Sequence, residues 1–231
     1  MASPSRFPNG VGTRKMPDPL RNYIHPDPTD MHRYFDDFDT YTAAQWTVTV
    51  VGTGTAALAA GDGGLLALAT SGAGSDSVLM QKATEGFSFE AGKPAWFKTR
   101  FKVSALTTVV VIGLQVTDTT SLDVTDGVYF LSTVTTGAVT TYSRKDATTG
   151  SATGTGITLV ADTFTELAWF WDGKGSVEYW QDGAQKGTIT GVTASTYLPD
   201  TTTTISFGVQ TSTAAIKTMT VDYVLAAKSR R

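Results

Sequence analysis

The chain has 231 residues, of which 41% are hydrophobic and only 17% are charged, and its formal net charge is −3 at pH 7. This balance gives no basic surface for nucleic acid. The absence of cysteine excludes a disulfide framework, a thiolate metal site and a cysteine nucleophile. The longest apolar run, VVVIGL at residues 109–114, is too short to span a bilayer. The first ten residues lack the apolar run of a signal peptide. We therefore expect a soluble protein made in a cytoplasm, with neither a membrane nor a nucleic acid as partner.

The polar residues are of kinds that favour strands and turns. The chain holds 41 Thr, whose β-branched side chain suits a pleated surface, and 23 Gly. Of its 21 acids, 17 are Asp, the acid most common in turns. This composition predicts a β protein.

Residues 1–34 form the first segment of the chain. Six of the eight prolines lie within residues 1–28, so this stretch cannot be a helix or a central strand. Because arginines and spaced apolar side chains interrupt it, we interpret it as an extended arm that lies on another surface. A disordered leader, or an arm that docks on its own domain, remains an alternative. The arm residues that we expect to make the contact are Phe7, Arg14, Leu20, Tyr23 and Ile24.

Residues 35–231 have the pattern of one β domain. AWFKTRFKV at 95–103 alternates apolar and basic side chains, so its apolar members should face a core. KTMTVDYVLAA at 217–227 alternates likewise, which predicts Met219, Val221, Tyr223 and Leu225 inward. About twelve such runs, separated by Gly, Asp, Ser and Thr turns, predict an all-β antiparallel sandwich or barrel. The polar stretches 148–156 and 201–204 are expected to be exposed loops.

One stretch, LAWFWDGKGSVEYWQDGAQKGTI at 167–189, resembles an enzyme site. Glu178 and Asp182 are four residues apart, as a catalytic carboxylate pair on one strand would be. However, Asp172 and Asp182 each precede a glycine, which indicates turns. Trp169 and Trp171 share a face with Leu167, which favours the core over an exposed sugar platform. We interpret this stretch as a hairpin.

Two aspartate groups are candidates for a structural cation. FDDFD at 35–39 and LDVTDG at 122–127 bring acids close together, and oxygen clusters of this kind bind Ca²⁺. Neither has the spacing of a dedicated calcium loop, although Asp37 and Asp222 could take part. Both histidines, His25 and His32, lie in the arm, so a histidine triad or metal site in the domain is not expected. We predict no metal and no cofactor.

The edges of the domain carry a resemblance to a known fold family. The opening YFDDFDTYTAAQW, the closing MTVDYVLAAK and the late hairpin FWDGKGSVEYWQDGAQKGTI resemble the concanavalin-like jelly-roll superfamily. Its members include laminin-G-like domains, legume-type lectins and laminarinase-type glycosidases. The resemblance implies a jelly-roll β-sandwich. The glycosidase branch carries its acids in an E-x-D-x-x-E strand, and none of the four glutamates here begins such a string. The resemblance therefore implies no enzyme.

A second resemblance covers the arm and the domain together. PSRFPNGV, PDPTDMHRYFDDFDTYTAAQWTVT, GDGGLLALAT, FEAGKPAWFKTRFKVS, GLQVTDTTSLDVTDGVYF and KTMTVDYVLAAK are similar to structural proteins of tailed bacteriophages, described as virion or capsid decoration (cement) proteins. This implies a non-enzymatic protein on the outer surface of the virion. It would bind the major capsid protein, stabilise contacts between its subunits, and form a homo-oligomer, a dimer or a trimer. The alternative is a carbohydrate-binding module of a head fibre or tail that touches the host surface.

Overall fold

The computed structural model describes residues 30–230 apart from 85, 134–135 and 148–150. These residues form fifteen strands in two antiparallel sheets, with two short 3-10 helices, η1 (Ala43–Gln45) and η2 (Ser121–Asp123). The all-β prediction is confirmed. Within this part of the chain no helix is long and apolar enough to cross a membrane.

Sheet A contains eight strands, and the C-terminal strand lies in its middle. In spatial order the strands are β13 (Ala184–Thr190), β12 (Ser176–Gln181), β11 (Thr165–Trp171), β6 (Ala95–Val103), β15 (Thr218–Ser229), β4 (Leu65–Ala69) and β3 (Thr55–Ala59). The eighth strand, β1 (Met31–Asp36), pairs with the second half of β15.

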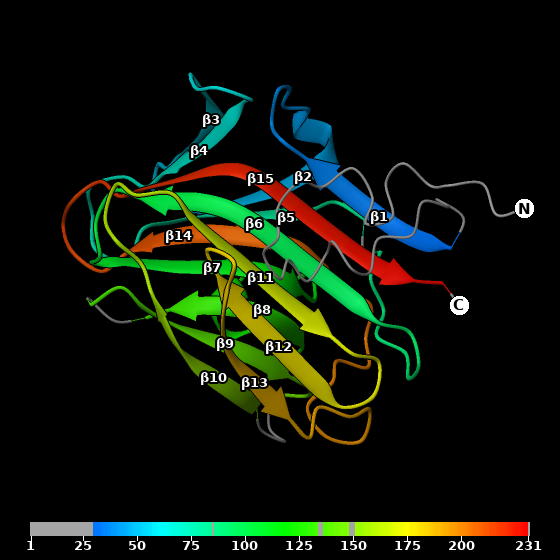
Figure 1. The fold of residues 1–231 in the computed structure, drawn as a ribbon. Helices are drawn as coiled ribbons and strands as arrows, with labels where there is room; N and C mark the ends of the chain where they lie inside the picture. Colours follow the sequence, from blue (N-terminus) through cyan, green and yellow to red (C-terminus); the bar gives the residue numbers. More distant parts are fainter. Residues whose placement is uncertain (1–29, 85, 134–135, 148–150, 231) are drawn as a thin grey trace, which may run out of the picture.

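Sheet B contains seven strands and lies behind sheet A in Figure 1. Its spatial order is β10 (Ser151–Thr158), β9 (Ala138–Arg144), β8 (Gly127–Ser132), β7 (Thr108–Gln115), β14 (Thr204–Thr211), β5 (Ser77–Lys82) and β2 (Trp46–Val51). Neighbours in each sheet are often far apart in sequence, as β6 and β15 are, so the sandwich closes only when distant strands pair.

The core lies between the sheets and is rich in aromatic rings. Phe97 and Trp169 face each other across β6 and β11, with ring centroids 5.9 Å apart. Trp169 and Trp171 are 0% and 1% exposed, so the prediction that they fill the core is confirmed. The inward alternation predicted for 95–103 is confirmed as well, because Phe97, Phe101 and Val103 belong to this core.

The alternation predicted for β15 is wrong in its second half. A bulge between Val221 and Tyr223 shifts the register against β6. An extra residue in one strand reverses the facing of every residue after it. Met219 and Val221 lie in the core as expected, but beyond the bulge Val224 and Ala226 face inward. Tyr223 and Leu225 lie on the other face, paired with Arg100 and Lys98.

Three strands exceed the dozen predicted, namely β1, β3 and β13. The strand β1 begins at Met31, inside the segment assigned to the arm, and its Met31–Asp36 register with β15 is continuous. Residues 1–29, which hold the rest of the predicted arm, lie outside the described residues. The segment expected to be a loop at 148–156 is β-strand from Ser151. A side chain at Gly154 would meet the ring of Tyr179 at 2.5 Å, so this position of β10 requires glycine.

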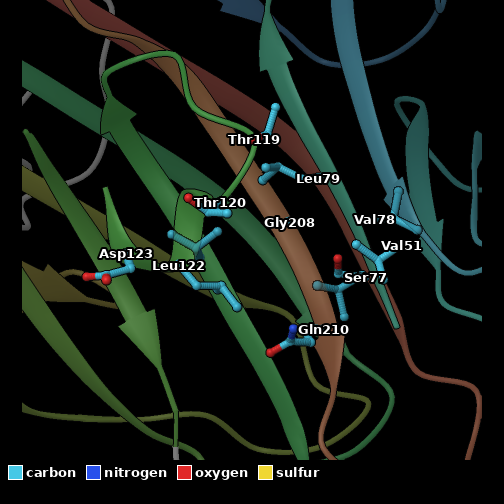
Figure 2. A pocket seen from close by; sticks show the side chains of 12 residues that line it. Val51, Ser77, Val78, Leu79, Thr119, Thr120, Leu122, Asp123, Gly208 and Gln210 are labelled. Carbon is cyan, nitrogen blue, oxygen red and sulfur yellow. The ribbon is translucent and has the colours of Figure 1, made fainter. Parts of the chain in front are cut away.

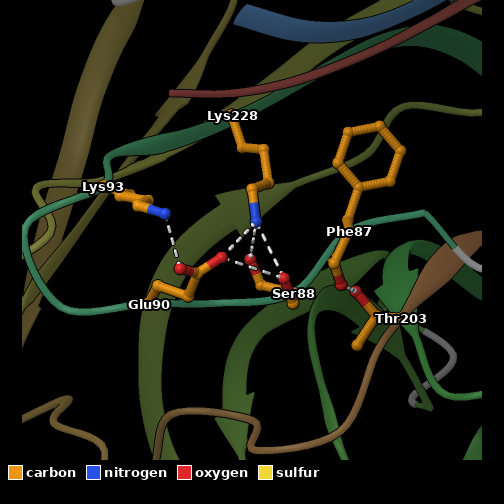
Figure 3. A network of polar contacts seen from close by, with 6 residues as sticks. All are labelled: Phe87, Ser88, Glu90, Lys93, Thr203 and Lys228. Carbon is orange, nitrogen blue, oxygen red and sulfur yellow. Dashed lines mark hydrogen bonds and ion pairs between the residues drawn. The ribbon is translucent and has the colours of Figure 1, made fainter. Parts of the chain in front are cut away.

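The connection between β5 and β6 is held by a polar network, shown in Figure 3. The ammonium of Lys228 donates to the Ser88 carbonyl at 2.9 Å and to Glu90 Oε1 at 2.9 Å. Lys93 pairs with the other oxygen of Glu90 at 2.6 Å. The hydrogen bonds from Lys93 and Lys228 lower the pKa of Glu90 to about 2. This network fixes the connection against β15.

Candidate functional site

The outer face of sheet B, which points away from the core, has side chains arranged in cross-strand rows. One row runs Leu131–Val111–Gly208–Leu79–Thr49, and the next runs Tyr142–Tyr129–Gly113–Ser206–Gln81–Thr47. The glycines are required by close packing: a side chain at Gly113 would meet the Tyr129 backbone at 2.5 Å, and one at Gly208 would meet Leu79 at 2.8 Å. The two rows therefore lack a side chain at Gly208 on β14 and at Gly113 on β7.

The β7–β8 connection, residues 116–126, folds back over these rows. Its Val124 is fully buried in a cluster with Leu79, Val111, Tyr129 and Leu131, and Val116 and Leu122 pack against that cluster. We call these five buried residues the face-B cluster. A loop rather than a third sheet thus covers the middle of this face.

A buried amide holds the loop in place. The Gln81 amide nitrogen donates to the Val116 carbonyl at 3.1 Å and to the Ser206 hydroxyl at 2.9 Å. Its oxygen accepts from the Asp118 backbone N–H at 3.0 Å. Gln81 is only 2% exposed, and its amide satisfies one backbone group on each of the half-buried loop residues Val116 and Asp118.

A groove of about 180 Å³ opens between this loop and strands β14, β5 and β2. Figure 2 shows Thr119, Thr120, Leu122 and Asp123 on the loop side, with Ser77, Val51 and Gln210 on the opposite side. Leu79, Val111, Leu122 and Gly208 give it an apolar floor. Its polar groups are hydroxyls, one carboxylate and one amide, from Ser77, Thr119, Thr120, Asp123 and Gln210.

Charged and aromatic groups extend the site beyond the groove. Arg144 on β9 donates to Asp123 at 2.8 Å and so steadies a carboxylate whose side chain is 83% exposed. Tyr129 and Tyr142 stack with ring centroids 5.4 Å apart, and Tyr142 is half-buried. Burial raises the pKa of the Tyr129 phenol above its usual range.

The residues of the enzyme-like stretch lie elsewhere. The oxygen Oδ1 of Asp172 accepts from the backbone N–H groups of Lys174, Gly175 and Ser176 at 2.8–3.0 Å. Although burial acts to raise it, these donors lower the pKa of Asp172 overall. Asp182 has a positive φ of 51° and accepts from the Glu166 N–H. Both acids are turn residues, as interpreted from the sequence. Glu178 pairs with Phe170 and Thr188 on the outer face of sheet A.

Among the described residues, neither candidate aspartate group gathers by itself into a cluster that could hold a cation. The carboxylate of Asp36 accepts from the Tyr34 hydroxyl and the Phe38 N–H, and Asp222 pairs with Arg100. Instead Asp126, Asp146 and Asp200 offer oxygens within 4.8 Å of one another. Lys145 lies 2.9 Å from Asp200 and supplies a positive charge there.

The predicted partner-binding residues Phe7, Arg14, Leu20, Tyr23 and Ile24 lie outside the described residues. The groove residues were missed by sequence reasoning because they come from five separate segments of the chain. The apolar run VVVIGLQ at 109–115 predicted a strand, but a continuous apolar run does not indicate which face of that strand would hold a groove.

Comparisons with known proteins support the fold. No protein-family model and no curated protein matches this chain. A protein of unknown function, SO2946 from Shewanella oneidensis MR-1, is similar at 17% identity over 86% of this chain and 87% of its own, with a TM-score of 0.58. An endo-1,3-beta-glucanase from Streptomyces sioyaensis is similar at 12% identity, covering 90% and 100%, with a TM-score of 0.62. Peanut lectin is similar at 8% identity, covering 86% and 97%, with a TM-score of 0.52.

The glucanase overturns one prediction. An enzyme shares this fold over its whole length, so the prediction of a non-enzymatic protein, made from the missing acid string, is wrong. At these identities the neighbours establish the fold alone. The described part of the chain is a concanavalin-like jelly-roll β-sandwich, the fold class that the sequence resemblance implied.

Proposed function

We propose that this chain is a carbohydrate-binding β-sandwich whose sugar site is the groove on the outer face of sheet B. The observation that carries the proposal is the composition of the groove, an apolar floor beside hydroxyl, carboxylate and amide groups. A sugar ring has the matching chemistry, since its C–H groups form an apolar face and its hydroxyls point outward. Binding sites for small molecules commonly combine an apolar lining with a few polar groups that orient the ligand.

The size of the groove limits the ligand. Its volume of about 180 Å³ is below the roughly 300–1,000 Å³ of pockets for drug-sized molecules. We therefore expect one sugar ring to be recognised, either at the end of a glycan or as one unit of a longer chain. Two of the neighbours reported above, the glucanase and the lectin, have names that point to carbohydrates. They support the proposal without identifying the sugar.

A glycan array probed with the full chain tests this function. We expect specific binding that is lost in Val51→Trp, because Val51 borders the groove, is 52% exposed, and can accept an indole that fills it. Leu58→Trp is the matched control, since Leu58 is 48% exposed on β3 in the other sheet. Binding that survives Val51→Trp, or no binding to any glycan, would contradict the proposal. Trp171→Ala is not a useful test, because Trp171 lies in the core.

The capsid-decoration function is a second candidate. It rests on the resemblance of the arm and domain segments to tailed-phage virion proteins. In that role the chain would sit on the outer surface of a capsid, as a dimer or trimer, with Phe7, Arg14, Leu20, Tyr23 and Ile24 against the major capsid protein. A glycan-binding face on sheet B is compatible with this location.

Co-sedimentation of the full chain with phage capsids tests the second candidate. We expect Phe7→Asp and Arg14→Glu to weaken the association, while Val51→Trp leaves it unchanged. A deletion should not pass residue 29, because β1 begins at Met31 and its loss would damage sheet A. Unchanged association of the arm variants would contradict the predicted contacts.

A further inference from the structure

The outer face of sheet A carries large apolar side chains that are hidden from solvent. Trp96, Phe170 and Trp180 alternate along their strands with residues of the core, so they point to the opposite face. Trp96 and Phe170 are direct cross-strand neighbours and stack at 5.4 Å. With Met31, Ala168 and Ala227 they form one cluster, which we call the face-A cluster.

The burial of these rings requires a cover. Trp96, Phe170 and Trp180 are 3%, 5% and 6% exposed, values as low as those of many core residues. Their neighbours Ala168 and Ala227 are too short to shield an indole from above. The two sheets include every described strand, so the described part of the chain places no third layer of strands here. Residues 116–126 cover the outer face of sheet B (face B), and the outer face of sheet A (face A) needs an equivalent segment.

The chain enters the domain at this cluster. Met31, the first residue of β1, is itself a member, and the Arg230 N–H donates to the Asp30 carbonyl at 2.9 Å. Residue 30 is therefore fixed at the end of β15, beside the rings. Twenty-nine residues precede it, and they carry apolar side chains at Leu20, Tyr23 and Ile24.

The length of this segment is sufficient. Residues 20–30 can span up to about 36 Å when extended, and the prolines at 26 and 28 favour an extended path. From β1 to β12 the face crosses four strand spacings, or about 19 Å.

We propose that residues 20–24 of the same chain lie across the face-A cluster, with Leu20, Tyr23 and Ile24 packed on Trp96, Phe170 and Trp180. The segment is then a structural cover of sheet A, and these three side chains are unavailable to another protein while it is docked. The proposal does not depend on glycan binding at face B. It competes with the capsid contact for Leu20, Tyr23 and Ile24 and leaves Phe7 and Arg14 free for that role.

Oxidative footprinting of the full chain tests the cover. In the wild type, Trp96 and Trp180 should react as slowly as the core residues Trp169 and Trp171. The triple variant Leu20→Asp, Tyr23→Asp, Ile24→Asp should raise oxidation of Trp96 and Trp180 several-fold, with Trp169 and Trp171 unchanged. The control Ser5→Asp, Asn9→Asp, Thr13→Asp adds the same charge outside residues 20–24, keeps the apolar side chains and should behave as wild type. Equal oxidation of Trp96 and Trp180 in the triple variant and the wild type would overturn the proposal.

A second measurement needs no disruptive variant. The chain has no cysteine, so Asp18→Cys carries a single spin label in an otherwise native protein. The label should broaden the indole N–H signals of Trp96 and Trp180 more than the amide signal of Tyr142 on face B. A mixture of spin-labelled chain without ¹⁵N and ¹⁵N-labelled chain without the spin label should give no broadening. Broadening in the mixture would show that a second copy supplies the segment, and no broadening in either sample would show that the segment lies elsewhere; both results overturn the proposal.

Discussion

The buried amide of Gln81 provides a sharp test of how the β7–β8 loop is held over face B. Replacing it by methionine keeps the length and flexibility of the side chain but removes its donors and acceptor. The Val116 carbonyl and the Asp118 N–H then lose their partners, whereas Ser206 keeps a weak bond to the Thr204 carbonyl at 3.4 Å. An unsatisfied buried polar group costs about 1–3 kcal/mol. For two such groups, partly relieved by water, we expect Gln81→Met to lose about 2–4 kcal/mol of unfolding free energy.

Urea unfolding followed by tryptophan fluorescence measures this loss. Gln185→Met is the matched control, because Gln185 is exposed on β13 and bonds only the Thr188 hydroxyl at 3.3 Å among the described residues. It should change the free energy of unfolding by less than about 0.5 kcal/mol. Hydrogen exchange at the Asp118 N–H should also accelerate in Gln81→Met alone. If Gln81→Met is as stable as the control and Asp118 exchange is unchanged, the loop is not held by this amide.

Three further predictions concern the core, a turn and a titration. Trp169→Ala should cost about 3–5 kcal/mol of unfolding free energy. The control Phe35→Ala, at a side chain that is 55% exposed, should change the unfolding free energy by less than about 0.5 kcal/mol. Similar losses for the two variants in urea unfolding would contradict the core assignment of Trp169. Asp172→Ala should cost about 0.5–2 kcal/mol of unfolding free energy, as the loss of a helix cap does. Asp172→Asn should recover part of this loss because asparagine keeps a side-chain oxygen that accepts the backbone N–H groups. Equal stability of the two variants would contradict the role of Asp172 in the turn. The pKa of Glu90 is lowered from 4.5 to about 2 in the folded state, so its ionised form stabilises the folded state above pH 4.5. This contribution is lost as the pH falls through about 2. A carboxyl carbon NMR titration of Glu90 with its midpoint near 4.5 would exclude the contacts with Lys93 and Lys228.

Local alternation made part of the fold predictable. In β6 the pattern of Phe97, Phe101 and Val103 against Lys98 and Arg100 indicated which face meets the core, and it is confirmed. Leu167 on the same face as Trp169 and Trp171 indicated a core role for both indoles, and the two Asp-Gly pairs indicated turns. In each case the deciding residues lie within a few positions of one another.

Features set by distant pairing could not be predicted. The bulge near Asp222 lies where β15 stops pairing with β4 and continues along β6, and it turns Tyr223 and Leu225 outward against the alternation of the sequence. The glycine-rich strand β10 has no periodic apolar pattern and depends on Tyr179 of β12. The candidate groove depends on Gln81 meeting Ser206, 125 positions away, beneath a loop whose sequence indicated only a group of aspartates.

NMR mapping of a bound glycan shows directly whether the groove on the outer face of sheet B is the sugar site. The ¹⁵N-labelled full chain would be titrated with the glycan that binds best on the array. We predict that the largest amide shifts occur at Ser77, Thr119, Leu122 and Gly208, which line the groove on face B, and that Val51→Trp removes them. Shifts centred on any other surface, or none at saturating glycan, would contradict the assignment of this groove as the carbohydrate site.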